Sequence, residues 1–299
     1  MGYPTSDTFS SLIDEVITSL SGFGTENDAV CTLLEPVTAS SVVLSVDDTD
    51  DVSRGLLEIE EEILYVNSAE NGTVTLQSWG RGYKGTTAVA HAAGTPVFVA
   101  PTWPRAVVAR EVNNTIRAVY PNLWAIGTND FSSSPTTWQY VMPAAVERVL
   151  SVEWRWTTDL DGWMPITGWE LIQSANVTDF ATGKALLISE PLPAGCRIHV
   201  TYAKAPTFLS LPTDTYASTG LPSSSRDVIV YGAASRLLPW QDTGRIPVTA
   251  VSSDVQDSLK PVGNGIVLSK ELRNLYVTRL ADERRALLER YPTRTHRVR

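Results

Sequence analysis

Four stretches of the chain place apolar residues at intervals of three and four. This spacing predicts amphipathic helices, because residues at i, i+3 and i+4 share one helix face. The stretches are 6–20, 104–120, 223–238 and 269–291. Ser224 or Ser225 is expected to cap the third helix and Ser269 the fourth, while Pro239 is expected to end the third. The third stretch is apolar on nearly every side, so we expect it to lie at the centre of a bundle.

Between these helices the apolar period changes to two, which is typical of strands with one buried face. The first such region covers 31–100 and the second about 137–206. The predicted strands are 42–46, 63–66, 73–76 and 96–99 in the first region, and 145–156, 163–172, 185–189 and 196–202 in the second. Asn71-Gly72, between two predicted strands, indicates a two-residue type I′ hairpin turn. The segment 128–135 is rich in Ser, Thr and Asn and predicts a linker.

Helices separated by two β regions predict an α+β fold. Because no helix alone can bury its apolar face, we expect one discontinuous helical bundle with two inserted antiparallel β domains, a small barrel and a sandwich. The bundle with its basic C-terminal tail is assigned to 1–30, 101–130 and 207–299, the small β barrel or sandwich to 31–100, and a Trp-rich β sandwich to 131–206.

Acidic and basic residues are unevenly placed along the 299-residue chain, whose formal net charge is −9. Residues 1–70 hold 15 acids and the single base Arg54, whereas residues 270–299 hold nine bases and four acids. This asymmetry favours head-to-tail contact between copies or with a partner, with solvated surface charge as the alternative. No run of about 18 apolar residues is present, so we expect no membrane span. We interpret Cys31 and Cys196 as small buried hydrophobes.

Residues 79–85, Trp-Gly-Arg-Gly-Tyr-Lys-Gly, contain the G-x-G-x-x-G pattern after a predicted strand. A dinucleotide site also needs a helix that opens at the glycines and an acidic residue about 20 positions later. Here the segment 86–96 is too short and too rich in Ala and Gly for that helix, and the next acid is Glu111. We therefore interpret the pattern as a glycine-rich loop and expect no cofactor.

The titratable residues form no catalytic or metal-binding pattern. Four aspartates within 47–51 could hold calcium, but the glycine and terminal glutamate of an EF-hand are missing, so we interpret 47–51 and Glu60-Glu61-Glu62 as solvated loops. The chain has three isolated histidines, His91, His199 and His296. None lies in a Ser/His/Asp or metal-ligand spacing, and G-x-S-x-G is absent. We predict no catalytic residue and no metal site, and so no enzyme.

Tryptophans are concentrated in the second β region. They are Trp138, Trp154, Trp156, Trp163 and Trp169. Trp154 and Trp156 are two residues apart and share a face of their predicted strand. An aromatic face of this kind can stack on sugar rings, which makes a glycan-binding module one interpretation. The other interpretation is a sandwich core.

The stretch 81–97 resembles a pattern common in virion proteins of tailed bacteriophages. There a strand, here 62–66, runs into a hairpin and then R-G-x-x-G-T-T-x-x-x-H-x-x-G-T-P-V. A second resemblance lies in the C-terminal third. A small-residue helix, a loop and the segment 268–294, which contains R-R-A-L-L-E-R-Y-P, are similar to head-to-tail adaptor (connector or neck) proteins of long-tailed phages that infect actinobacteria. The element common to that family is a small helical bundle.

The resemblance implies a ring, most often of twelve subunits, that joins capsid to tail below the portal and lets double-stranded DNA pass without specific binding. The implied partners are further copies, the portal protein and a downstream neck or tail-completion protein, and no catalytic residue or cofactor is implied. The implied location is the virion neck, and the host cytoplasm during assembly. A mainly acidic protein would repel the DNA phosphates and let DNA slide.

The basic end of the chain is the candidate contact with the portal or a neighbouring subunit. Its residues are Arg284, Arg285, Arg290, Arg294, Arg297 and Arg299. Arginine forks pair well with carboxylates, so an acidic surface is the expected target. The alternative function is a tail or baseplate protein whose Trp-rich β module binds host glycan.

Overall fold

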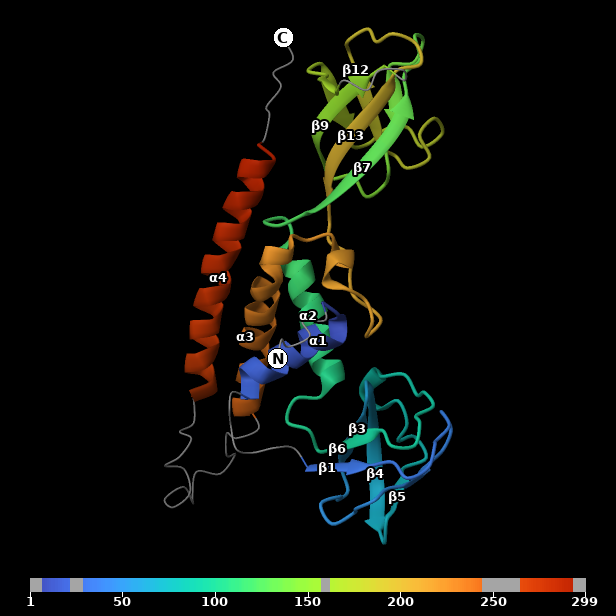
Figure 1. The fold of residues 1–299 in the computed structure, drawn as a ribbon, viewed down its shortest axis with the longest axis vertical. Coiled ribbons are helices and arrows are strands. Elements are labelled where there is room, and N and C mark those ends of the chain that lie inside the picture. Colours follow the sequence, from blue (N-terminus) through green and yellow to red (C-terminus); the bar gives the residue numbers. More distant parts are fainter. Residues whose placement is uncertain (1–6, 22–28, 157–161, 244–263, 293–299) are drawn as a thin grey trace. The chain divides into compact units, whose positions relative to one another are not determined.

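The computed structural model describes residues 7–21, 29–156, 162–243 and 264–292 (Figure 1). Within these ranges, thirteen strands form three antiparallel sheets, and four α-helices accompany them. The chain divides into two compact units. The first unit comprises Met1–Phe9, Thr115–Ile229 and Arg273–Arg299, and the second comprises Ser10–Asn114 and Val230–Leu272. Each unit contains one β region with its own apolar core.

The second unit contains a six-stranded antiparallel sheet that curls into a half-barrel. In sheet order its strands are β1 (Ala29–Thr32), β6 (Pro96–Val99), β3 (Leu56–Ile59), β4 (Glu62–Glu70), β5 (Thr73–Leu76) and β2 (Val43–Ser45). An isolated bridge between Leu33 and Val46 joins the segments that follow the two edge strands. The β4–β5 hairpin turns through Asn71 and Gly72, whose φ angles are 50° and 74°. A type I′ turn requires both angles to be positive, so the predicted turn is confirmed.

The half-barrel closes around aliphatic side chains that alternate along its strands. Leu57 and Ile59 on β3, and Leu64 and Val66 on β4, are all inaccessible to solvent and belong to one apolar cluster. On β5 and β6 burial alternates with the period of two that the sequence shows, whereas β3 and the start of β4 are buried on both faces.

The first unit contains two sheets that share a core. The four-stranded sheet has the order β10 (Met164–Pro165), β9 (Arg148–Arg155), β13 (Arg197–Lys204) and β7 (Ala125–Ser132), and the three-stranded sheet has the order β11 (Trp169–Ile172), β12 (Ala185–Ile188) and β8 (Gln139–Val141). Figure 1 shows β7, β9 and β13 as long neighbouring strands. Side chains from both sheets, among them Val152, Leu186 and Val200, form one buried cluster.

Two predictions for this region are wrong. The segment predicted as a linker includes the second part of β7, from Thr128 to Ser132, and β7 pairs with β13 from Arg197↔Ser132 to Lys204↔Ala125. The ladder uses backbone hydrogen bonds, so a polar edge strand needs few apolar side chains and escapes a pattern-based search. The single strand predicted at 163–172 is two short strands, β10 and β11, which belong to different sheets.

The four helices are α1 (Phe9–Ser21), α2 (Arg105–Val119), α3 (Arg226–Thr243) and α4 (Asn264–Arg290). Burial follows the predicted spacing on α1 and α2, as Leu12 and Val16 and then Val108 and Val112 show. The guanidinium of Arg105 forms an ion pair with Asp14 and hydrogen-bonds Ser10, so it ties the start of α2 to α1. None of the described helices is long and apolar enough to cross a membrane.

Two predicted helix signals act differently in the structure. Pro239 does not end α3 but lies inside it. Proline has no N–H, so the carbonyl of Ser235 cannot accept the usual helix hydrogen bond from position 239. The hydroxyl of Ser269 donates to that carbonyl instead, at 2.6 Å. Ser269 is therefore not the cap of α4, which begins five residues earlier at Asn264.

The predicted fold class, a helical bundle with two inserted β domains, is also wrong. The fold is organised by its three sheets and not by its four helices. The long helix α4 is not enclosed, since five of its large apolar side chains are about half exposed. They are Ile266, Val267, Leu268, Leu275 and Val277. The prediction gave the helices too large a role in the fold. Each β region buries its own apolar residues, so the helices do not organise the whole chain.

Candidate functional site

The glycine-rich stretch forms a loop, as predicted, and ends in a short 3₁₀ turn at Tyr83–Gly85. No helix opens there, because α2 starts only at Arg105. Gly82 has a φ of 59°, and a Cβ at this position would lie 2.8 Å from the carbonyl oxygen of Thr86. This glycine is therefore required by the path of the backbone itself.

The loop is held to the half-barrel by a cluster of four ionisable side chains, Glu60, Glu62, Arg81 and His91, which we call the Glu62 cluster. Arg81 binds Glu62 through two hydrogen bonds, Nε–Oε1 at 2.7 Å and Nη2–Oε2 at 2.8 Å. Both ring nitrogens of His91 face carboxylates, Nε2 at 2.9 Å from Glu62 and Nδ1 at 2.9 Å from Glu60. The side chains of Glu62 and His91 are inaccessible to solvent, while that of Glu60 is 60% exposed.

Burial alone would raise the pKa of Glu62, but hydrogen bonds from Arg81, His91 and the backbone N–H groups of Gly82 and Val89 outweigh it and lower the pKa to about 2. Those two N–H groups lie 2.8 and 3.2 Å from the carboxylate. The carboxylate is thus ionised at neutral pH and accepts hydrogen bonds on both oxygens.

Arg81 extends this attachment beyond Glu62. Its guanidinium also donates to the backbone carbonyls of Thr38, Ser41 and Val89, the last two at 3.0 and 2.5 Å. One side chain therefore joins strand β4, the loop after β1 and the segment before His91. Every polar edge of this buried arginine is occupied by the protein, which indicates a structural role for the cluster.

The prediction that residues 60–62 form a solvated loop is wrong for Glu62. Its position on β4 contains the signal that was missed, since Glu62, Leu64 and Val66 alternate onto one buried face. The partners of Glu62 gave no local signal, because Arg81 and His91 are 19 and 29 residues away in sequence. Only the fold brings them to the carboxylate.

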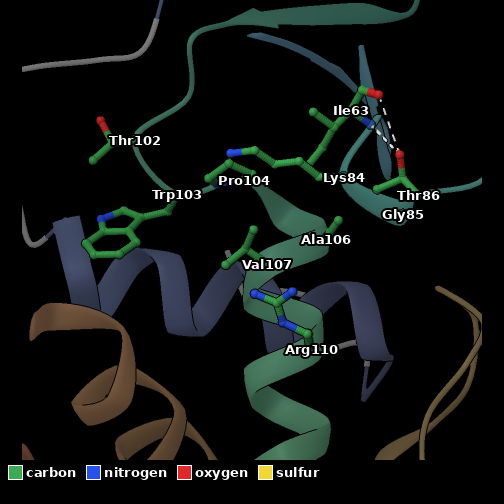
Figure 2. Close-up of a pocket in the computed structure, with 10 residues that line it drawn as sticks. All are labelled: Ile63, Lys84, Gly85, Thr86, Thr102, Trp103, Pro104, Ala106, Val107 and Arg110. Carbon is green, nitrogen blue, oxygen red and sulfur yellow. Dashed lines mark hydrogen bonds between the residues drawn. The ribbon is translucent and has the colours of Figure 1, made fainter. Parts of the chain in front are cut away.

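Beside the same loop, the second unit contains a cavity of about 480 Å³ (Figure 2). Ile63, Trp103 and Val107 contribute apolar lining, and two cations, Lys84 and Arg110, also line it. Lys84 comes from the 3₁₀ turn and Arg110 from α2. No carboxylate is among the lining residues. The volume lies in the range typical of small-molecule sites.

The predicted arginine contact residues lie on α4 and beyond it. Arg284 and Arg285 are exposed, and so is Arg290, whose guanidinium lies 5.6 Å from the centre of the Tyr291 ring. Arg294, Arg297 and Arg299 lie outside the described residues.

On its less exposed side α4 is held to the start of α3. Arg279 Nε donates to Asp227 at 2.7 Å, and the hydroxyl of Ser224 donates to Glu283 at 2.6 Å. The contact with Asp227 raises the pKa of Arg279. Ser224, one of the two expected helix caps, thus contributes to the attachment of α4.

The tryptophans of the second β region do not form one exposed platform. The rings of Trp154 and Trp156 meet edge to face with centroids 5.9 Å apart, in line with the predicted shared face. Trp154 and Trp169 pack against the apolar core, whereas Trp138 and Trp156 are 49% and 42% exposed.

The remaining histidines and acids are dispersed. His199 pairs with Asp130 at 2.6 Å, and this hydrogen bond lowers the pKa of Asp130, while His296 lies outside the described residues. Asp47 accepts a hydrogen bond from the N–H of Thr32, which lowers its pKa. Among the residues that the structure describes, no group of three or more His, Cys, Asp or Glu could hold a metal ion.

No protein-family model matches the chain, and no curated protein matches it either.

Proposed function

We propose that the chain is a structural protein of a tailed-phage virion, a head-to-tail adaptor that assembles into a ring below the portal. The proposal rests on one observation: the residues of the motif that resembles virion proteins hold the loop to the half-barrel. Arg81, Gly82 and His91, which define that motif, are all engaged in holding one loop to the half-barrel. A motif that serves to fix architecture suits a protein whose task is assembly.

The surface of α4 supports the same proposal. A ring of subunits needs contact surfaces, and half-exposed large apolar side chains in groups are typical of such surfaces. Leu268 and Leu275, seven residues apart, are 50% and 48% exposed on one side of the helix. The exposed cations Arg284 and Arg285 follow on the same helix and would meet an acidic surface of the portal or of a neighbouring copy.

The charge distribution agrees with passage of DNA through the ring. The net charge of −9 disfavours binding to phosphates, whose contacts with proteins depend on Lys and Arg. DNA could then slide through without being held.

The test is to measure the mass of the purified chain by mass photometry and to image it by electron microscopy, alone and with portal protein. A closed ring, alone or on the portal, is the expected result. Arg284→Glu/Arg285→Glu should weaken attachment to the portal, most strongly at low salt, because surface charge pairs are screened over about 8 Å at physiological ionic strength. Arg273→Glu, on the same helix, is the matched control.

Deletion of residues 292–299 should weaken docking further if the arginines there join the contact. A chain that stays a monomer or trimer with portal present, and that binds sugars on a glycan array, would instead favour the tail or baseplate alternative. The half-exposed Trp138 and Trp156 are the observation behind that alternative.

A further inference from the structure

The cavity between the glycine-rich loop and α2 is lined by basic residues, although the N-terminal part of the chain is strongly acidic. Residues 1–70 hold 15 acids and one base, yet the lining of the cavity includes two cations and no acid. Figure 2 shows Lys84 reaching out from the loop and Arg110 on the α2 side.

Arg110 itself has a carboxylate partner, since its Nε lies 3.7 Å from Glu111 Oε1. Glu58, Glu62 and Arg105 form contacts with other parts of the protein. Glu58 accepts a hydrogen bond from the backbone N–H of Arg105 at 2.5 Å. Glu62 is enclosed in its cluster, and the guanidinium of Arg105 is directed to Ser10 and Asp14 on α1. The lining of the cavity therefore carries two cations and no carboxylate, while Glu111, the ion-pair partner of Arg110, lies on α2 outside the lining.

Lys84 occupies an unfavourable backbone conformation. Its φ of 54° and ψ of 27° lie in the left-handed region, which a non-glycine residue adopts at a cost of about 1–2 kcal/mol. Its neighbour Gly85 is also left-handed, with a φ of 84°, so the turn would accept glycine at position 84. Strained residues of this kind are concentrated at ligand sites.

Apart from the two cations, Gly85, Thr86 and Thr102, the residues that line the cavity are apolar. Trp103 is 9% exposed, and Pro104 and Val107 continue the apolar surface along α2. On the loop side, the hydroxyl of Thr86 accepts a hydrogen bond from the N–H of Ile63 at 3.1 Å, which fixes the turn that carries Lys84 (Figure 2).

We propose that this cavity binds a small organic anion that has an apolar body. The acidic head group, a carboxylate, phosphate or sulfonate, lies between Lys84 and Arg110, and the apolar body lies against Trp103 and Val107. Charge-assisted hydrogen bonds hold the head group, and removal of the apolar surface from water holds the body. The site is independent of the adaptor role, so a ring could form whether or not the cavity is filled.

The probe is 1-anilinonaphthalene-8-sulfonate, which combines a sulfonate with an apolar ring system, added to the full chain and followed by its fluorescence and by calorimetry. We expect saturable binding at one site. Lys84→Gln and Arg110→Gln should each weaken it about tenfold, since each removes one charge-assisted hydrogen bond. Arg54→Gln, an exposed cation of the same unit that does not line the cavity, should leave the affinity unchanged.

Three further measurements separate binding in this cavity from adsorption elsewhere. Ala106→Phe should fill the cavity and abolish binding without a change of charge. Dodecanoate should displace the probe, whereas inorganic phosphate, which has no apolar body, should not. Lys84→Gly should weaken binding while raising the melting temperature, because it relieves the left-handed backbone. Equal binding by wild type, Lys84→Gln and Ala106→Phe, or equal loss with Arg54→Gln, would overturn the proposal.

Discussion

Replacement of Glu62 by glutamine is the sharpest test of the structural role assigned to the Glu62 cluster. The substitution keeps the size and shape of the side chain and removes its charge. It leaves Arg81, whose side chain is 7% exposed, without its buried counter-charge. The new NH₂ group of glutamine would also face N–H groups that now donate to the Glu62 carboxylate. We expect the half-barrel to be strongly destabilised.

The magnitude follows from the pKa of Glu62. A fall from 4.5 to about 2 corresponds to about 3 kcal/mol in favour of the ionised folded state, since one pKa unit equals about 1.4 kcal/mol. Removal of one partner from a buried ion pair typically costs about 3–5 kcal/mol, which agrees with that figure. The prediction is therefore a loss of about 3 kcal/mol in the free energy of unfolding of this unit.

Hydrogen exchange followed by mass spectrometry is the appropriate assay, because it reports each unit separately. The amides of β3, β4 and β6 should exchange about two orders of magnitude faster in Glu62→Gln. The amides of β13, in the other unit, serve as an internal reference. Glu70→Gln is the matched control, since Glu70 lies on the same strand but is exposed, and such surface changes usually stay within about 0.5 kcal/mol.

A double-mutant cycle with Arg81→Met adds a second criterion. The two substitutions should be clearly non-additive, because each alone leaves a buried partner unpaired. If Glu62→Gln alters exchange no more than Glu70→Gln does, or if the two effects simply add, the cluster does not stabilise the half-barrel in the way described.

Three other predictions follow from the structure. Because the pKa of Glu62 is lower in the folded than in the unfolded state, its stabilisation is complete above about pH 4.5 and is lost as the pH falls toward about 2. Acid titration followed by circular dichroism should therefore show a larger loss of stability in wild type than in Glu62→Gln, which keeps only the loss due to other carboxylates such as Asp47 and Asp130. Ser269→Ala should cost about 1–3 kcal/mol by leaving the Ser235 carbonyl unpaired, and the cost should shrink in a Pro239→Ala background, as thermal unfolding would reveal. Gly82→Ala should cost at least about 1–2 kcal/mol in the same assay, because its left-handed backbone disfavours a Cβ.

Much of the local structure follows from neighbouring residues and was predictable. The spacing of apolar residues located α1 and α2 because helix burial repeats every three or four positions. The Asn71-Gly72 pair located the β4–β5 hairpin because these residues accept the positive φ angles that the turn requires. The glycine-rich stretch was predicted to be a loop because the segment after it is too short for a helix, which is also a local feature, and the structure has a loop there.

The tertiary structure decided which distant groups are in contact. These contacts gave some residues a structural role different from the one predicted. Pro239 was expected to stop a helix, but Ser269 satisfies the carbonyl that the proline leaves free, so the helix continues. Glu62 was expected to be solvated, but Arg81 and His91 bring compensating hydrogen bonds to it inside the sheet. The sequence by itself determined where helices and hairpins form, since those depend on residues a few positions apart. Only the fold could supply the partners of a buried polar group, because its hydrogen bonds come from residues far away along the chain.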